Sequence, residues 1–295
     1  MKIKLLILFY ILNTFNAIKL LGEPASFSRI GTSAKETGMG NSVVASVEGI
    51  SSIEYNPAGI AIQHSLSLFS GYSSLFEKTY NFGFFGLIPT KILNLGIGFT
   101  QLGIDDIKIS DYNYNLGDFN ASARILFFSI GVSQFAPIFL GLNTKYLTQN
   151  LYESKQSGLS WDLGLISNFE IIRIGFCLKN LISTKFGSES LPLVLEGGLS
   201  LNLNLQKLFK KDGKKEGVLI LKLSPQINYI PAENKIEKLF GTEIIPSRFF
   251  SIYFGLNNGF AFGLGVNISF IQTNFSILLH EVLDTSYKFS LILKF

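Results

Sequence analysis

The feature that most limits the fold of this chain is a strict alternation of apolar with small or polar residues. Between 193 and 205 every second residue is Leu, except for Gly197, and the residues between them are mostly small or polar. A β-strand points alternate side chains to opposite faces, so one face of this segment is apolar and the other is small and polar. The same period of two recurs at 93–100, 173–179 and 260–270. The pattern predicts an all-β chain.

The length of these segments and the composition favour a membrane barrel over a soluble β-sandwich. The segments run for about ten to fourteen residues, whereas strands of soluble proteins average about 5–6 residues and transmembrane strands about 9–11. Charged residues make up 16% of the 295 residues, against about 25% in soluble domains. No apolar stretch after residue 21 is long enough for a membrane-spanning helix, and a closed barrel is the other structure that pairs every backbone group in lipid. We therefore expect a transmembrane antiparallel β-barrel.

Counting the alternating segments gives about fourteen strands, an even number, as single-chain bacterial barrels have. The expected strands are 65–76, 79–90, 92–103, 120–133, 137–150, 158–168, 170–180, 192–205, 217–230, 236–246, 248–257, 260–270, 272–282 and 285–295. With both chain ends in the periplasm, the long connections 104–119, 151–157 and 181–191 face outward, as external loops do in such barrels. The exception is the basic connection 206–216, which is either a solvated hairpin turn or a docking patch.

The two ends of the chain carry patterns typical of exported outer-membrane proteins. Lys2 and Lys4 precede a short apolar run that ends at Leu12, which predicts a signal peptide over 1–17, with cleavage as late as about residue 25. The last strand has an apolar face that ends at the C-terminal residue and consists of Tyr287, Phe289, Leu291, Leu293 and Phe295. This ending resembles the signal read by the barrel assembly machinery, an edge strand open for pairing. We expect the chain in the bacterial outer membrane.

Residues 26–64 differ from the segments that follow. They are rich in small residues and show no long alternation. Val43, Val44 and Val47 fall on one face of a short helix that is expected to end at Gly49. This part of the chain is therefore expected to lie outside the sheet.

A turn is predicted where an Asn-Pro pair follows an aromatic residue, in the motif Tyr55, Asn56, Pro57, Ala58 and Gly59. Together with the small-residue segment before it, the motif resembles the N-terminal region of the FadL/PorV-like outer-membrane proteins, including an uncharacterised spirochaete branch. The resemblance implies that 26–64 fold as a hatch inside a fourteen-stranded barrel formed by 65–295. The family often has more acidic residues before the motif than Glu48 and Glu54, and no ligand-contacting residue carries over by motif.

Charges of both signs fall on the inward faces of the expected strands. They are Lys145, Asp162, Arg173, Lys179, Glu196 and Lys222. We expect them to pair within a plugged lumen, because an unpaired buried charge is costly. The mixture predicts no ion selectivity, and a net charge of +4 is too small to indicate a nucleic-acid partner.

No motif for catalysis or for metal binding stands out. Cys177 is the single cysteine, and His64 and His280 are the two histidines, which excludes a three-histidine site or a cysteine cluster. The chain has no G-x-S-x-G motif, and the aspartates between 105 and 118 do not follow EF-hand spacing. We expect no catalytic residues, no metal and no cofactor, and therefore no enzyme.

The resemblance implies three possible roles. The first is FadL-like passive uptake of hydrophobic or amphipathic small molecules past the hatch. The second is a PorV-like scaffold or shuttle for protein secretion, and the third is a structural outer-membrane barrel. In each case the expected partners include outer-membrane lipid and the barrel assembly machinery, and uptake adds hydrophobic small molecules.

Overall fold

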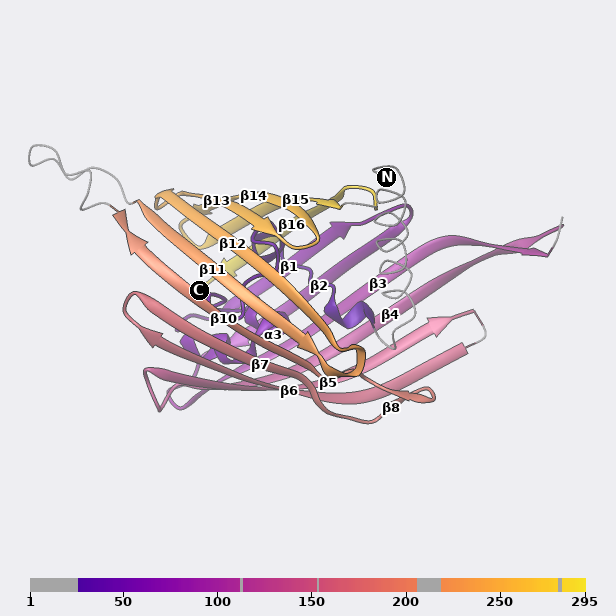
Figure 1. The fold of residues 1–295 in the computed structure, drawn as a ribbon, viewed down its shortest axis with the longest axis horizontal. Helices are drawn as coiled ribbons and strands as arrows, with labels where there is room; N and C mark the ends of the chain where they lie inside the picture. Colours follow the sequence, from indigo (N-terminus) through magenta and orange to yellow (C-terminus); the bar gives the residue numbers. More distant parts are fainter. Residues whose placement is uncertain (1–25, 112–113, 153, 206–218, 281–282) are drawn as a thin grey trace, which may run out of the picture.

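Fourteen antiparallel strands close into a barrel in the computed structural model of the chain (Figure 1). The structure describes residues 26–295 apart from 112–113, 153, 206–218 and 281–282. The closed barrel and its strand number confirm the predicted fold class. The expected signal peptide and the basic connection 206–216 lie outside the described residues.

Each barrel strand pairs with its neighbours along the chain, and the last strand pairs with the first. The barrel strands are β1 (Ser67–Ser74), β2 (Thr79–Ile88), β3 (Leu93–Asp111), β4 (Tyr114–Val132), β5 (Ile138–Leu151), β6 (Ser154–Phe169), β7 (Ile172–Ser183), β10 (Val194–Asn204), β11 (Ile220–Ile230), β12 (Lys235–Ser247), β13 (Phe250–Leu256), β14 (Gly259–Ile268), β15 (Ile271–His280) and β16 (Ser286–Lys294). A small hairpin of β8 (Lys185–Phe186) and β9 (Glu189–Ser190) lies between β7 and β10, and the 3₁₀ helix η4 (Pro231–Glu233) joins β11 to β12.

The two faces of the wall differ as the alternation predicts. In β10, 44% of Leu199 is exposed, whereas none of the neighbouring Ser200 is. Large apolar side chains such as Phe84, Phe128 and Leu264 are also exposed on the outer face. A continuous apolar surface of this size is unfavourable in water and is typical of the outer face of membrane barrels. This face is therefore the one that contacts lipid. Among the described residues, no helix is long and apolar enough to span a membrane.

The prediction of an external loop at 104–119 is wrong. Strands β3 and β4 extend into this segment and form a two-stranded arm beyond the barrel (Figure 1). The last pair of β3 with β2 is Ile104 with Thr79, and the pairing of β4 with β5 stops at Ser122. Beyond these points β3 and β4 pair only with each other, with register shifts after Ile104 and Ile109. Each strand supplies the other's backbone partners, so polar side chains do not end the pairing. The expected loop 181–191 likewise contains the end of β7 and the β8–β9 hairpin.

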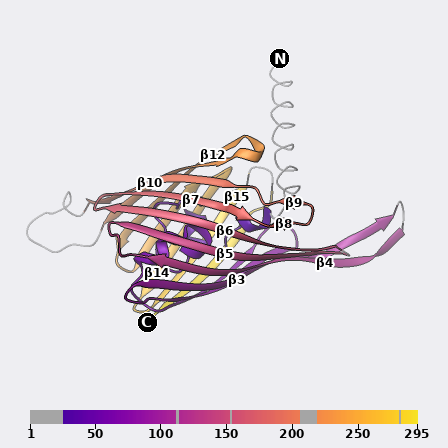
Figure 2. The same ribbon diagram turned by 90° about the horizontal axis from the view of Figure 1, so that it is seen from below.

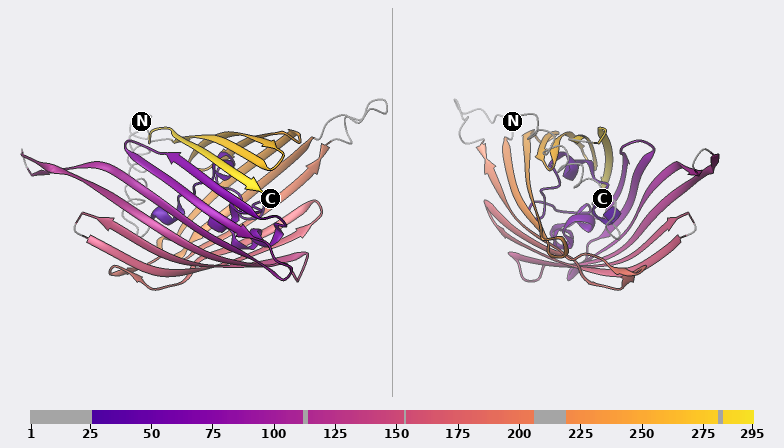
Figure 3. Two further views of the ribbon diagram at one scale, coloured as in Figure 1. Left: turned by 180° about the vertical axis from the view of Figure 1, so that it is seen from behind. Right: turned by 45° about the vertical axis from the view of Figure 1, so that its right-hand side comes forward.

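Residues 26–64, called the hatch from here on, lie inside the ring of strands (Figures 2 and 3). The hatch elements are η1 (Ser26–Arg29), α2 (Ala34–Gly38), α3 (Ser52–Tyr55) and η2 (Pro57–Ile62). Helix α2 packs on β13–β16, and η2 packs on β3–β6. The hatch therefore reaches opposite sides of the wall.

The helix expected to end at Gly49 is not formed, because the chain makes a turn at 44–46 instead. The backbone N–H of Val44 donates to Oε1 of Gln226 on β11 at 2.8 Å, and its carbonyl accepts from the Asn56 side chain at 2.7 Å. These contacts take the backbone groups that a helix would have paired internally. Val43, Val44 and Val47 are nevertheless buried, as expected of an apolar face.

Glycines on the wall allow the hatch to approach it closely. A Cβ on Gly141 would lie 2.1 Å from the carbonyl carbon of Pro57, and one on Gly164 would lie 2.1 Å from Oδ1 of Asn56. The same conflict with hatch atoms arises on ten strands, at Gly71, Gly83, Gly96, Gly131, Gly141, Gly164, Gly175, Gly198, Gly241 and Gly255. We call these residues the glycine belt. They let backbone and side-chain atoms of the hatch touch the wall around most of its circumference.

Candidate functional site at the hatch

Asn56 is the centre of the aromatic-Asn-Pro-Ala-Gly motif. Its Oδ1 accepts a hydrogen bond from the backbone N–H of Ala58 at 3.2 Å, and its Nδ2 donates to the carbonyl of Val44 at 2.7 Å. The same Nδ2 lies within 3.4 Å of the Leu165 and Phe176 carbonyls on β6 and β7. Asn56 thus caps η2 and also joins two hatch segments to the wall. The expected turn is the start of a 3₁₀ helix, because Asn is a good N-cap and Pro57 fits the first helical position.

The other motif residues mainly pack, and the Tyr55 hydroxyl is the polar side-chain group among them, buried without a hydrogen-bond partner among the described residues. Gly59 leaves no room for a side chain, since its Cβ would lie 2.3 Å from Oγ of Ser52. Pro57 and Ala58 lie against Gly141 of the wall. The Tyr55 ring is buried, and the ammonium of Lys179 lies 5.9 Å from its centre. The motif therefore docks the hatch and shapes its surroundings.

The charged residues expected to face the lumen all lie within ion pairs inside the barrel. Lys145 and Asp162 are both almost fully buried, with Nζ 2.6 Å from Oδ1. Asn180 completes this pair, because its Oδ1 accepts from Lys145 at 2.8 Å and its N–H donates to Asp162 at 2.9 Å. Such a pair is tolerated in a low-dielectric interior because its remaining hydrogen-bonding groups are satisfied.

The remaining pairs join wall to wall or hatch to wall. Lys179 pairs with Glu196 at 3.1 Å and Lys222 with Glu243 at 3.1 Å. Arg173 of β7 reaches Glu48 of the hatch at 2.7 Å.

Hatch cations also reach two acidic residues of β12 that were not predicted from the sequence to face the lumen. Arg29 lies 2.6 Å from Glu237, and Lys35 lies 2.9 Å from Glu243. Both glutamates lie an even number of positions from the inward Gly241 along β12, so they lie on the same inward face. The alternation of that strand could therefore have predicted that they face the lumen.

Glu48 and Lys35 of the hatch remain charged at neutral pH. Burial pushes the pKa of Glu48 upward, but Lys222, Arg173 and Lys35 outweigh it and lower the pKa to about 2. Burial pushes the pKa of Lys35 down, but the Glu243 carboxylate and other nearby groups raise it above its usual value. These two groups therefore hold the hatch by charge as well as by packing.

Part of the inward face is apolar where it meets the hatch. Phe69, Phe85 and Phe127, from β1, β2 and β4, form a chain with ring centres 5.2 and 5.9 Å apart. These rings belong to one buried cluster with other wall and hatch residues, among them Phe27, Ile53, Ile60, Leu87, Ile125 and Leu147. Phe186 of the β8–β9 hairpin joins the cluster through Phe27, with ring centres 6.1 Å apart. The wall thus presents both polar and apolar sectors to the hatch.

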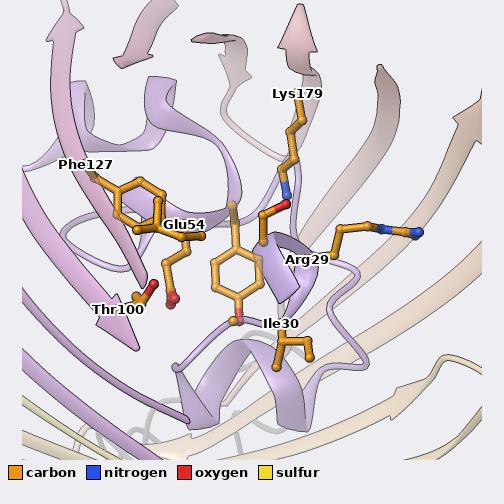
Figure 4. Close-up of a pocket in the computed structure, with 10 residues that line it drawn as sticks. Arg29, Ile30, Glu54, Thr100, Phe127 and Lys179 are labelled. Carbon is orange, nitrogen blue, oxygen red and sulfur yellow. The ribbon is translucent and has the colours of Figure 1, made fainter. Parts of the chain in front are cut away.

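A pocket lies where these two sectors meet (Figure 4). It is a small cavity of about 20 Å³, which is room for about one water molecule. Its lining comprises Ser28, Arg29, Ile30, Gly31, Glu54, Tyr55, Thr100, Ile125, Phe127 and Lys179. Figure 4 shows Glu54 extending toward the Thr100 side, whereas Arg29 points to the opposite side. Burial raises the pKa of Glu54, although hydrogen bonds from Thr32 oppose this effect.

The described residues contain no group of three or more His, Cys, Asp or Glu placed to hold a metal ion. No protein-family model matches the sequence. No curated protein matches it in sequence either.

Solved structures do match the fold. The toluene transporter TbuX of Ralstonia pickettii aligns over 91% of this chain and 100% of its own, with 13% identity and a TM-score of 0.62. A deltaS2S3 mutant of the monoaromatic hydrocarbon channel TodX aligns over 90% and 98%, with 8% identity and a TM-score of 0.57. A Pseudomonas aeruginosa FadL homologue aligns over 90% and 98%, with 9% identity and a TM-score of 0.51. The fold of this chain is therefore the FadL-family barrel fold.

Proposed function

We propose that this protein resides in the bacterial outer membrane and passively takes up hydrophobic or amphipathic small molecules. The observation that carries the proposal is the apolar sector of the inward wall, beside a pocket at the hatch. The similar fold of a toluene transporter and of a monoaromatic hydrocarbon channel supports it. Export through an N-terminal signal peptide belongs to the same proposal.

The physical reason is a difference in what the inner wall favours. A porin has a polar, water-filled lumen. An apolar solute that passes through it stays in water and gains no free energy from burying its surface. Here Phe85, Ile125 and Phe127 form an apolar sector of the inner wall that is buried against the hatch. An apolar solute that replaced hatch atoms on this sector would gain about 25 cal/mol for each Å² of surface that it buries. A secretion scaffold or a structural barrel has no need of apolar surface beside an internal pocket.

The test measures the initial rate of uptake of labelled toluene by bacterial cells that have an outer membrane. Cells with the full chain are compared with cells without it and with cells carrying Ile125→Gln, which places a polar group in the pocket. Ile125→Leu is the matched control, and heat-modifiable gel mobility equalises the amount of folded barrel. Faster uptake with the wild type and Ile125→Leu, and slower uptake with Ile125→Gln, is the expected result. Equal rates with and without the protein would refute uptake.

Assembly is the second part of the proposal. In β16, Tyr287 and Phe289 point outward, while Lys288 and Ser290 are buried inward. The strand pairs with β1 to close the barrel, and Phe295 donates its backbone N–H to the Leu66 carbonyl at 2.8 Å. Before closure this strand is an unpaired edge with an apolar face that includes Leu291 and Leu293, as the assembly machinery would need.

A further inference from the structure

The cavity at the hatch has the size and the lining that a single water molecule needs. Its volume of about 20 Å³ exceeds the minimum of about 10–15 Å³ for one water. Most of the lining surface is polar. Buried waters occupy polar cavities in which they find about two to four hydrogen-bonding partners. The side chains around the cavity therefore decide whether a water is held there.

The Tyr55 hydroxyl lies at this cavity without a partner of its own. A Cβ on Gly31, another lining residue, would lie 2.1 Å from Tyr55 Oη, so the hydroxyl packs directly against Gly31. Only 6% of Tyr55 is exposed, and its hydroxyl has no hydrogen-bond partner among the described residues. Burying a hydroxyl without a hydrogen bond is unfavourable. An acceptor in the cavity would remove this cost.

Two further lining side chains have hydrogen-bonding capacity for the same guest. The Glu54 carboxylate accepts from the Thr32 N–H at 3.0 Å and from the Thr32 hydroxyl at 2.9 Å, and a carboxylate can accept about four hydrogen bonds. The buried Thr100 hydroxyl makes no hydrogen bond to any residue that the structure describes. Figure 4 shows Glu54 extending toward the Thr100 side. Glu54 and Tyr55 belong to α3 of the hatch and Thr100 to β3 of the wall, so the cavity lies between the two.

The charges around the cavity favour a neutral guest. The Arg29 guanidinium lies 2.6 Å from Glu237 on β12, and the Lys179 ammonium lies 3.1 Å from Glu196 on β10. Since wall carboxylates offset both cations of the lining, no anion is needed to balance them. A metal cation would be repelled by the same two side chains. Water is the neutral molecule that fits the volume.

We propose that the cavity binds one ordered water molecule, which joins helix α3 of the hatch to β3 of the wall. The water accepts a hydrogen bond from the Tyr55 hydroxyl and donates to the Glu54 carboxylate and to the Thr100 hydroxyl. It thereby gives the aromatic residue of the motif a polar contact with the wall. The inference goes beyond the proposed uptake, because it holds whether or not the barrel transports anything.

The first test is a crystal structure of the full chain in detergent, at a resolution that shows ordered water. We expect a density peak at hydrogen-bonding distance, about 2.5–3.0 Å, from both Tyr55 Oη and a Glu54 carboxylate oxygen. Absence of that peak from the wild type would overturn the proposal.

The second test is the direction in which the thermal midpoint of the folded barrel moves in Tyr55→Phe. This variant keeps the ring that faces Lys179 and removes the hydroxyl. If the hydroxyl binds a water, the midpoint should fall by about 2–4 °C, as for the loss of one hydrogen bond. A midpoint that stays the same or rises would overturn the proposal, because removing an unpaired buried hydroxyl costs nothing. Tyr146→Phe, on the exposed outer face of β5, is the matched control and should leave the midpoint unchanged.

A double variant shows whether Tyr55 and Thr100 bind the same water. Thr100→Val keeps the shape of the side chain and should also lower the midpoint. Because both hydroxyls would hold one molecule, the loss in Tyr55→Phe with Thr100→Val should be smaller than the sum of the two single losses. Losses that add fully would overturn the bridge between hatch and wall.

Discussion

Some residues at the boundary between hatch and wall make two different stabilising contacts each. Asn56 caps η2 and also bonds the carbonyl of Val44. Glu243 binds a hatch cation, Lys35, and a wall cation, Lys222. Because each residue joins segments far apart in the sequence, its loss would affect both the hatch and the wall.

The pair of Glu48 with Arg173 predicts a pH-dependent attachment of the hatch. The folded-state pKa of Glu48 is about 2, below its ordinary value of 4.5. The stabilisation is therefore present above pH 4.5 and lost as the pH falls through 2. Glu48→Gln should lower the thermal midpoint at pH 6 by a small amount, because 42% of the Glu48 side chain is exposed.

The measurement is the thermal midpoint of both proteins from pH 6 to pH 2. The gap between them should shrink below pH 4.5 and close near pH 2. Glu170→Gln, in the exposed turn between β6 and β7, is the control and should open no gap. A gap for Glu48→Gln that stays constant over the whole range would contradict the assignment.

Two neighbours in β10 test the direction of each face. Leu199 meets lipid, and Leu199→Arg should destabilise the barrel by about 2–4 kcal/mol if it lies near the bilayer midplane. Ser200 is fully buried, and its hydroxyl has no hydrogen-bond partner in the part of the chain that the structure describes. Ser200→Ala should therefore leave stability unchanged or raise it slightly. Urea unfolding in lipid vesicles checks both, and the opposite ranking would mean that the two faces are exchanged.

At the scale of elements, η2 and the glycine belt determine how the hatch sits. Helix η2 touches β3, β4, β5 and β6. Gly141 of β5 meets the backbone of Pro57 and Ala58. Because the atoms in contact are backbone atoms of the hatch and of β5, neither segment can move easily to make room for a side chain at Gly141.

Gly141→Ala should destabilise the folded barrel by about 1–3 kcal/mol, the usual range for overpacking. Its Cβ would lie 2.1 Å from the carbonyl carbon of Pro57. The control is Gly86→Ala on the lipid side of β2, where the nearest atom would be 3.7 Å away and the change should be within about 0.5 kcal/mol. Urea midpoints of the folded gel band compare the two, and equal midpoints would refute a tight hatch–wall fit at Gly141.

The end of β16 matters for assembly more than for the folded state. Phe295 stacks on Phe270 with ring centres 6.1 Å apart, and its backbone bond to Leu66 does not depend on its side chain. Phe295→Ser should therefore lower the yield of folded barrel in membranes and alter the midpoint of the folded fraction little. Phe270→Ser removes the same stacking without changing the C-terminal residue. If it lowers the yield equally, the C-terminal residue has no special role in assembly.

At the scale of the whole molecule, the alternation of residues was enough to predict the closed fourteen-stranded barrel. The alternation of apolar and polar residues can be recognised within each strand by itself. It recurs in the strands of the wall because one face of each strand contacts lipid and the other faces the lumen. The arm of β3 and β4 escaped prediction because strand pairing, not apolar alternation, maintains it beyond Ile104.

The inside of the barrel could be predicted only in part. Inward charges such as Lys145 and Asp162 follow from strand parity, but their partners come from distant strands and from the hatch. Val44 does not form a helix because Gln226 and Asn56 bind its backbone groups. The pocket brings together the hatch, β3, β4 and β7, so no local pattern in the sequence marks it.

Ionic conductance of the purified full chain in a planar bilayer tests the central claim, a barrel sealed against water by a docked hatch. We predict no steady conductance for the wild type, because the hatch contacts the wall at glycines on ten strands. Replacing both Asn56 and Pro57 with Gly should raise the conductance while the barrel still assembles, since the cap and the fixed φ are lost. A steady, pore-like conductance of the wild type would contradict the account.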